Sequence, residues 1–186
     1  RYHRETPELF VSQQLFTATD AIGFAYGVTW NTIRRNIFTW KGARAFGLSS
    51  PLPPTQADLE NPPSADHPGN LENKVQTFCA IPNILAFLKD YIVFAEKEEE
   101  LQKFILRQHQ TGAVEATVRR ALDPHRTRGL VWNTQGSGKT FTIIKAAEML
   151  FRAPAADKPT VLLMIDRNKL EDQMLKNLAA LGLGNL

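Results

Sequence analysis

The apolar positions of residues 9–40 fall in short groups separated by turn-forming residues. Residues 9–18 (LFVSQQLFTA) and 24–30 (FAYGVTW) are rich in aromatic and β-branched side chains, which favour strands. Residues 19–23 (TDAIG) predict a turn between them, and residues 36–40 (NIFTW) predict a third short strand. This part of the chain is therefore expected to form a small β-rich or α+β piece.

A proline-rich stretch follows at residues 49–70, with six prolines and few large apolar side chains. Proline fixes φ and removes a backbone donor, and the stretch offers little to bury, so we predict a linker or long loop. It is also the expected domain boundary, which divides the chain into residues 1–48, 49–70 and 71–186.

Helical spacing of apolar residues dominates the next fifty positions. We predict helices over residues 71–78, 83–97 and 98–122. The acidic run Glu98–Glu100 is expected to lie at the positive N-terminal end of the third helix, where the helix dipole favours carboxylates.

The pattern changes again from residue 129. Residues 129–133 (GLVWN) predict a short strand, and residues 160–165 (TVLLMI) predict a strand buried on both faces, as in a parallel sheet. Residues 139–151 and 168–181 predict amphipathic helices. Their predicted inward positions are Ile143, Ile144, Ala147 and Leu150 in the first, and Leu170, Met174, Leu178 and Leu181 in the second. The order of strand, loop, helix, strand and helix is the βαβ unit of an α/β nucleotide-binding fold.

The composition is that of a globular protein, with 186 residues, 43% hydrophobic content and a net charge of +3. So small a positive excess does not by itself predict nucleic-acid binding. No apolar run approaches the ~20 residues of a membrane span, and no membrane partner is expected. Cys79 is the only cysteine, which fits a reducing cytosol, and we predict a buried, inert thiol. The chain begins without methionine and stops just after a helical pattern, so we expect a fragment of a longer protein.

The glycine-rich stretch VWNTQGSGKT, residues 131–140, falls between the predicted strand and the predicted helix. Glycines without side chains let backbone N–H groups close around phosphate oxygens, and the helix start directs its unpaired N–H groups at the same anion. Lys139 would reach the β- and γ-phosphates of ATP, and the Thr140 hydroxyl would bind Mg²⁺. The predicted phosphate-loop residues are Thr134, Gln135, Gly136, Ser137, Gly138, Lys139 and Thr140.

The loop departs from the general pattern G-x-x-x-x-G-K-[ST] at one position, because Asn133 replaces the first glycine. The form T-Q-G-S-G-K-T is the variety found in superfamily 2 helicases and translocases. A glycine-rich turn followed by an unrelated Lys-Thr pair is the alternative reading.

With these motifs in place, the chain resembles the restriction (R) subunit of type I restriction–modification enzymes. Residues 131–150 (VWNTQGSGKTFTIIKAAEML) are similar to its motor motif I, and residues 161–173 (VLLMIDRNKLEDQ) to its next motif. Residues 1–20 (RYHRETPELFVSQQLFTATD) resemble the last part of its N-terminal nuclease domain.

The resemblance implies a large DNA-translocating ATPase joined to a PD-(D/E)xK nuclease. Such an enzyme uses ATP and Mg²⁺ in the prokaryotic cytosol, acts on double-stranded DNA with modification and specificity subunits, and cuts unmodified DNA. The expected fold is α/β: the start of a RecA-like motor lobe, with a parallel sheet flanked by helices, preceded by the C-terminal end of an α+β nuclease domain.

Further residue roles rest on the same resemblance. In residues 107–110 (RQHQ), Gln110 would bind the adenine edge with Arg107 nearby, because an amide both donates and accepts. His109 is interpreted as a helix-surface residue. Arg167 would touch the DNA backbone, and Tyr2 would be the tyrosine of a Q-x-x-x-Y element. The alternatives are a solvated glutamine, a surface arginine or one paired with Asp166, and a structural tyrosine.

The chain lacks the Asp-Glu pair that completes the magnesium site, and it lacks the second motor lobe. We therefore expect little or no ATPase or cleavage activity from this chain alone. Two other functions remain open: a different superfamily 2 helicase or remodelling ATPase, and a nucleotide-binding remnant without turnover.

Overall fold

The computed structural model describes residues 5–31, 33–41, 69–97, 100–125, 127–165 and 168–180. The chain divides into two compact units. The first comprises Arg1–Ile92 with Lys103–Ile105, and the second comprises Val93–Gln102 with Leu106–Leu186. Most of the predicted linker lies outside the described residues, which include only residues 69 and 70 of it. Tyr2 and Arg167 also lie outside the described residues.

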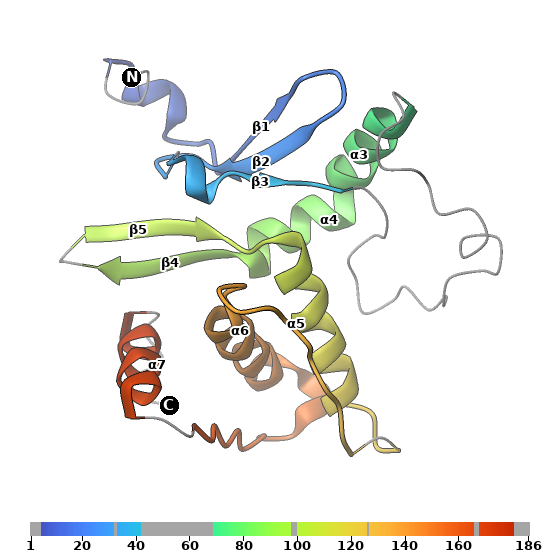
Figure 1. The fold of residues 1–186 in the computed structure, drawn as a ribbon, viewed down its shortest axis with the longest axis vertical. Coiled ribbons are helices and arrows are strands. Elements are labelled where there is room, and N and C mark those ends of the chain that lie inside the picture. The colour runs from blue at the N-terminus through green and yellow to red at the C-terminus, as the bar shows by residue number, and fades with distance from the viewer. Residues whose placement is uncertain are drawn as a thin grey trace. The chain divides into compact units, whose positions relative to one another are not determined.

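The first unit contains a three-stranded antiparallel sheet in the order β1-β2-β3 (Figure 1). Its strands are β1 (Leu15–Thr19), β2 (Phe24–Val28) and β3 (Phe38–Thr39), and its short 3₁₀ turns are η1 (Pro7–Phe10) and η2 (Arg34–Asn36). The register pairs Leu15 with Val28 and Thr19 with Phe24. The predicted turn is confirmed, and Asp20 Oδ1 accepts a hydrogen bond from Gly23 N at 2.6 Å within it. The first predicted strand starts later than expected, because the proline at the start of η1 favours a helical turn there.

An aromatic core holds this sheet against two helices of the same unit, α3 (Gly69–Cys79) and α4 (Ile81–Ala86). Tyr26 of β2 is fully buried, and its ring centroid lies 5.9 Å from Trp40, 5.2 Å from Phe78 and 5.6 Å from Phe87. The indole N–H of Trp40 donates to Thr77 Oγ1 at 3.0 Å, so the buried polar atom of the ring is satisfied. Offset and edge-on ring pairs of this kind add to the stability that burial alone provides.

The helix predicted over residues 83–97 ends earlier than the apolar spacing indicated. A π-helical turn, η3 (Phe87–Tyr91), is followed by strand β4 (Ile92–Lys97), which pairs with β5 (Glu100–Ile105) in an antiparallel hairpin (Figure 1). The predicted helical start at residue 98 is also wrong, since Glu100 begins a strand. β-Branched Ile92 and Val93 lose rotamer freedom in a helix and pack well in a strand, which allows β4 to form. The pairing of β4 with β5 then accounts for both differences.

Lys103 of β5 buries its amine inside the first unit. The Nζ atom donates to Thr29 Oγ1 at 2.8 Å, to Gln14 Oε1 at 3.2 Å and to the Gln13 carbonyl at 3.5 Å. All three acceptors are neutral, so burial is not offset by an opposite charge among them. Desolvation therefore lowers the pKa of Lys103 from its ordinary value of 10.5.

This burial predicts a specific dependence of stability on pH. The folded state releases the Lys103 proton at a lower pH than the unfolded state, so the unfolded state binds more protons between the lowered pKa and about 10.5. The free energy of unfolding should therefore gain a rising component across that window, and Lys103→Met should lack it. Urea denaturation of both proteins from pH 8 to about 10.5 measures the difference, because contributions of shared groups cancel. Parallel curves for the two proteins would contradict the prediction.

In the part of the second unit that the structure describes, the helices are α5 (Gln108–Ala121), α6 (Lys139–Arg152) and α7 (Asn168–Ala180), and η4 (Pro154–Ala156) is a short 3₁₀ turn. Helix α6 packs beside α5 and also contacts α7 (Figure 1). Val114 and Val118 of α5 and Ile144 of α6 are buried, so the two helices share an apolar interface. The predicted helices at residues 139–151 and 168–181 are thus confirmed in position.

The inward face of α6 is rotated relative to the prediction. Ile144 is buried as expected, but Ile143 is 41% exposed. Thr142 and Lys145 are buried instead, and the Lys145 amine pairs with Glu148 at 2.9 Å. This pair lets a lysine stem lie on the buried side of the helix.

The parallel sheet that the sequence predicted is not formed in the described residues. Residues 129–133 and 160–165 form no strand, and the sheets that are formed in the described residues are small and antiparallel. A strand exists only through ladder hydrogen bonds, and neither segment has a paired strand in the described part of the chain. Leu162 is 81% and Met164 88% exposed, whereas Val161 and Leu163 are half-buried. The segment thus keeps the two-residue alternation of a strand with one covered face, not two.

Two further predictions concern the burial of Cys79 and membrane-spanning helices. Cys79, predicted to be buried, is exposed at the last residue of α3, because the buried face of that helix is occupied by Phe78. Among the described residues, no helix is long and apolar enough to cross a membrane.

Candidate functional site: the phosphate loop

The loop of residues 134–138 folds into a tight bend that leads directly into α6. Gly138 is the N-cap residue of the helix, with φ 81°, and Gly136 has φ 74°. L-amino acids with side chains rarely adopt this left-handed conformation, so the bend needs glycine at both positions. The Ser137 N–H donates to the Thr134 carbonyl at 3.4 Å, which closes the turn. The bend therefore stands where a helix start offers unpaired N–H groups to an anion.

Lys139, the first residue of α6, reaches back over the loop. Its side chain is exposed, and Nζ donates to the Thr134 carbonyl at 2.7 Å. The same carbonyl also accepts the Ser137 N–H, so one oxygen receives both hydrogen bonds across the bend. The ammonium charge is thereby held beside the loop, although the side chain remains exposed.

Ser137 carries a buried hydroxyl for which the described residues offer no hydrogen-bond partner. The residue is 8% exposed. A buried polar group without a partner costs about 1–3 kcal/mol, so such an atom in a loop of this kind marks a place where a ligand oxygen or water can bind. The sequence identified Ser137 only as one member of the loop.

Two side chains at the start of α5 hold the loop from the other side. Gln110, 5% exposed, donates from Nε2 to the Gly138 carbonyl at 3.0 Å and accepts from the Arg107 N–H through Oε1 at 2.8 Å. His109 Nε2 lies 3.1 Å from the Ser137 carbonyl. The adenine contact predicted for Gln110 would have to use the second amide N–H and the remaining oxygen lone pair, because the others are engaged.

The other predicted site residues are distributed as follows. Thr140 is half-buried in the first turn of α6, Thr134 and Gln135 are exposed, and Arg107 is the half-buried N-cap of α5. The structure thus brings the RQHQ stretch and the phosphate loop together across 28 residues of sequence. His109 is the contact that sequence reasoning missed. Its only signal was its place next to Gln110 in the first turn of α5.

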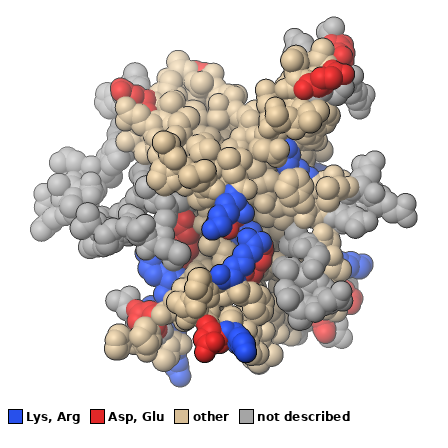
Figure 2. All heavy atoms as spheres, turned by 180° about the vertical axis from the view of Figure 1, so that it is seen from behind, with Lys and Arg blue, Asp and Glu red and all other residues tan. Residues whose placement is uncertain are grey.

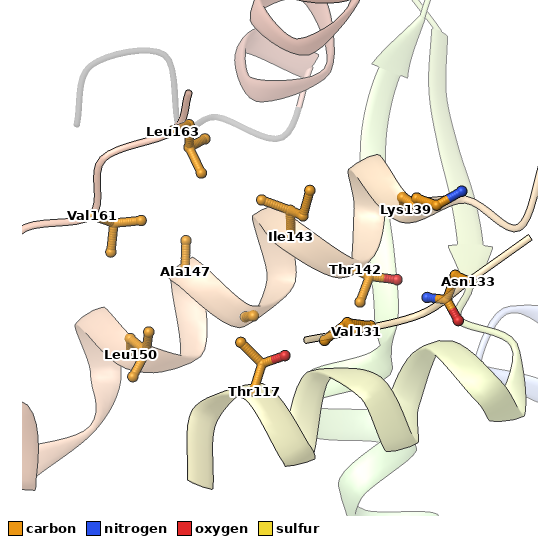
Figure 3. Close-up of a pocket in the computed structure, with 11 residues that line it drawn as sticks. Thr117, Val131, Asn133, Lys139, Thr142, Ile143, Ala147, Leu150, Val161 and Leu163 are labelled. Carbon is orange, nitrogen blue, oxygen red and sulfur yellow. The ribbon is translucent and has the colours of Figure 1, made fainter. Parts of the chain in front are cut away.

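A cavity of about 270 Å³ lies beside α6 but is not the phosphate site (Figure 3). Its walls are mostly apolar, and Figure 3 shows Ile143, Ala147, Val161 and Leu163 around it, with the Lys139 amine directed away at one edge. Phosphate needs converging donors and positive charge, whereas most side chains that line this cavity are apolar. The cavity is the space between α6 and the two segments that were predicted to be strands.

Surface charges of both signs are mixed on the face shown in Figure 2. On the face shown in Figure 2, Lys and Arg side chains occur in separate groups with Asp and Glu side chains among them. This mixture of signs among the described residues on that face agrees with the small net charge of +3.

Comparisons with known proteins found one matching family model and several similar proteins. Residues 109–185 match the family model of the SWI2/SNF2 ATPase. The type I restriction enzyme endonuclease subunit of Staphylococcus saprophyticus is 31% identical over 103 residues, which are 55% of this chain and 10% of the relative. The corresponding subunit of Staphylococcus aureus is 30% identical over 103 residues, again 55% of this chain and 10% of the relative.

A protein of Methanocaldococcus jannaschii that is named for the same kind of subunit aligns along nearly the whole chain. It is 22% identical over 183 residues, which are 92% of this chain and 17% of the relative. The resemblance to type I restriction subunits is thus confirmed. The chain spans about a tenth of the length of the Staphylococcus relatives. No solved structure shows a significant match.

Proposed function

We propose that the second unit binds the phosphates of ATP as part of the restriction subunit of a type I restriction–modification enzyme. The observation that carries this proposal is the bend of Gly136 and Gly138 at the start of α6, with the Lys139 ammonium over it. It lies within residues 109–185, which match an ATPase family model, in a chain that is similar to restriction endonuclease subunits.

The residues of the loop fit a triphosphate. The Ser137 hydroxyl, which has no hydrogen-bond partner among the described residues, the glycine N–H groups and the helix start supply donors, and Lys139 supplies a positive charge. The Thr140 hydroxyl is the residue that would hold Mg²⁺. Bound magnesium would neutralise charge on the β- and γ-phosphates, and Gln110 with Arg107 would contact the adenine. The role of this chain is then to position and neutralise the phosphates, which is most of what phosphoryl transfer requires of a protein.

The same proposal extends to the division of the chain into domains and to the substrate and partners of the whole enzyme. Residues 1–48 would be the end of the α+β nuclease domain, residues 49–70 a linker, and residues 71–186 the start of a RecA-like lobe. Helices α3 and α4 fall on the motor side of that division although they pack in the first unit. Double-stranded DNA would be the substrate, contacted in part by Arg167. Modification and specificity subunits would be the partners, in the prokaryotic cytosol.

The test uses the intact polypeptide that carries this sequence, assembled with its modification and specificity subunits. ATP hydrolysis and DNA cleavage are expected with unmodified DNA that contains the recognition sites, and neither is expected when those sites are methylated. Phosphate release and agarose gels measure the two activities. Hydrolysis that needs DNA but no other subunit would instead favour a different superfamily 2 motor, and nucleotide binding without turnover would favour a remnant.

A further inference from the structure

We infer that His109 is a positioning residue for the phosphate loop, which orients one peptide unit so that its N–H faces the bound phosphates. This inference rests on the proposed phosphate site and adds to it a residue whose sequence position suggested only a helix surface. It starts from one contact, the 3.1 Å distance between His109 Nε2 and the Ser137 carbonyl oxygen.

The direction of this hydrogen bond is fixed by chemistry. A carbonyl oxygen can only accept, so the Nε2 atom of His109 must carry the proton. The imidazole therefore donates either as the Nε2–H tautomer or as the imidazolium. In both forms it holds the Ser137 carbonyl toward the start of α5.

The direction of this carbonyl also determines the direction of the N–H group in the same peptide. In a trans peptide the C=O and N–H bonds point in opposite directions, and the described residues contain no cis peptide. The Ser137 carbonyl belongs to the same peptide as the Gly138 N–H. Holding that carbonyl toward α5 therefore turns the Gly138 N–H away from α5, to the side of the loop where phosphate oxygens would be bound.

The next peptide unit is held in the same way. The Gly138 carbonyl accepts hydrogen bonds from Gln110 Nε2 at 3.0 Å and from the Thr142 N–H of α6 at 3.3 Å, and it shares its peptide with the Lys139 N–H. His109 and Gln110, which are adjacent in α5, thus donate hydrogen bonds to the adjacent carbonyls of Ser137 and Gly138. The N–H groups of these two peptides then lie on the opposite side. Two N–H groups with a common direction form the kind of concavity that binds anions.

The contact also restricts the conformation of the left-handed Gly138. A peptide next to a glycine of φ 81° can rotate with little steric resistance, because glycine populates many conformations. Hydrogen bonds at the carbonyls before and after it restrict that rotation. His109 would therefore lower the ordering cost of phosphate binding, since a preorganised site loses less freedom.

The experiment measures phosphate affinity in the intact protein with His109→Leu, His109→Gln and a control, His125→Leu. Leucine removes the donor, whereas glutamine restores an N–H at a similar distance from the backbone. His125 is an exposed histidine outside the loop in the same unit, so its replacement by leucine controls for the loss of an imidazole. Inorganic tripolyphosphate and ATP are the phosphate probes, measured by calorimetry. Adenosine, measured by ligand-observed NMR, is the probe without phosphate.

We expect His109→Leu to weaken tripolyphosphate and ATP binding by about three- to tenfold, the equivalent of one hydrogen bond. His109→Gln should bind within about twofold of the natural protein, and His125→Leu should be unchanged. Adenosine affinity should be the same in all of them. Should His109→Leu fail to fold, His109→Ala, which adds no apolar bulk, takes its place.

Unchanged tripolyphosphate affinity in His109→Leu would overturn the inference while leaving the proposed function intact. Failure of glutamine to restore binding, or an equal loss of adenosine affinity, would also overturn it, because either shows a general structural effect. A natural protein that binds neither ATP nor tripolyphosphate would overturn the proposed function and this inference with it.

Discussion

Replacing Lys139 with alanine is expected to lower the affinity of the intact protein for ATP by about 10- to 100-fold. The magnitude follows from the loss of a charge-assisted contact, which contributes about 1.5–3 kcal/mol. Lys139 lies at the loop already, with Nζ 2.7 Å from the Thr134 carbonyl, so a phosphate oxygen would need only to replace that carbonyl as the acceptor. Calorimetric titration with ATP measures the change.

The fold should hardly change in this variant. Lys139 is exposed, and substitutions at exposed sites usually alter the free energy of unfolding by less than about 0.5 kcal/mol. Lys176→Ala on α7 is the matched control, because it removes the same charge from an exposed position in the same unit. ATP affinity in Lys139→Ala equal to that of Lys176→Ala would remove the main support for a phosphate site.

The loop and its helix could be predicted from sequence because their signals are local. Gly136, Gly138 and Lys139 lie within four consecutive positions, and the left-handed glycines and the helix start follow from those residue types alone. The β1–β2 hairpin is similarly local, with an Asp-to-Gly turn between runs of aromatic and β-branched residues.

What could not be predicted depends on partners distant in the sequence. The apolar residues around Ile92 satisfy a helical spacing and a strand propensity equally well, and the pairing of β4 with β5 decides between them. The contact of His109 with Ser137 joins residues 28 positions apart and involves a backbone carbonyl, which leaves no trace in residue type. The expected strands at residues 129–133 and 160–165 have the right composition, but composition does not supply a paired strand.

Replacing Gly138 with alanine is expected to destabilise the fold by about 2–5 kcal/mol and to impair ATP binding. An added Cβ would lie 2.3 Å from Gln110 Nε2, and φ at this position is +81°. The left-handed conformation alone costs a non-glycine residue about 1–2 kcal/mol. The Gln110 amide is buried and bonded to both Gly138 O and Arg107 N, so moving it aside breaks two hydrogen bonds of about 0.5–1.5 kcal/mol each.

Substitutions at two other glycines of the second unit distinguish the conformational cost from the cost of the clash. A Cβ at Gly136 meets nothing within 4 Å, but φ is +74°, so Gly136→Ala should show the conformational cost of about 1–2 kcal/mol without the clash. Gly112 is exposed within α5 and also meets nothing within 4 Å, so Gly112→Ala should stabilise the protein by about 0.5–1 kcal/mol. Urea denaturation ranks the three variants. If Gly138→Ala were no less stable than Gly136→Ala, the Gln110 amide would be free to move, and the close packing of α5 against the phosphate loop would not constrain the site.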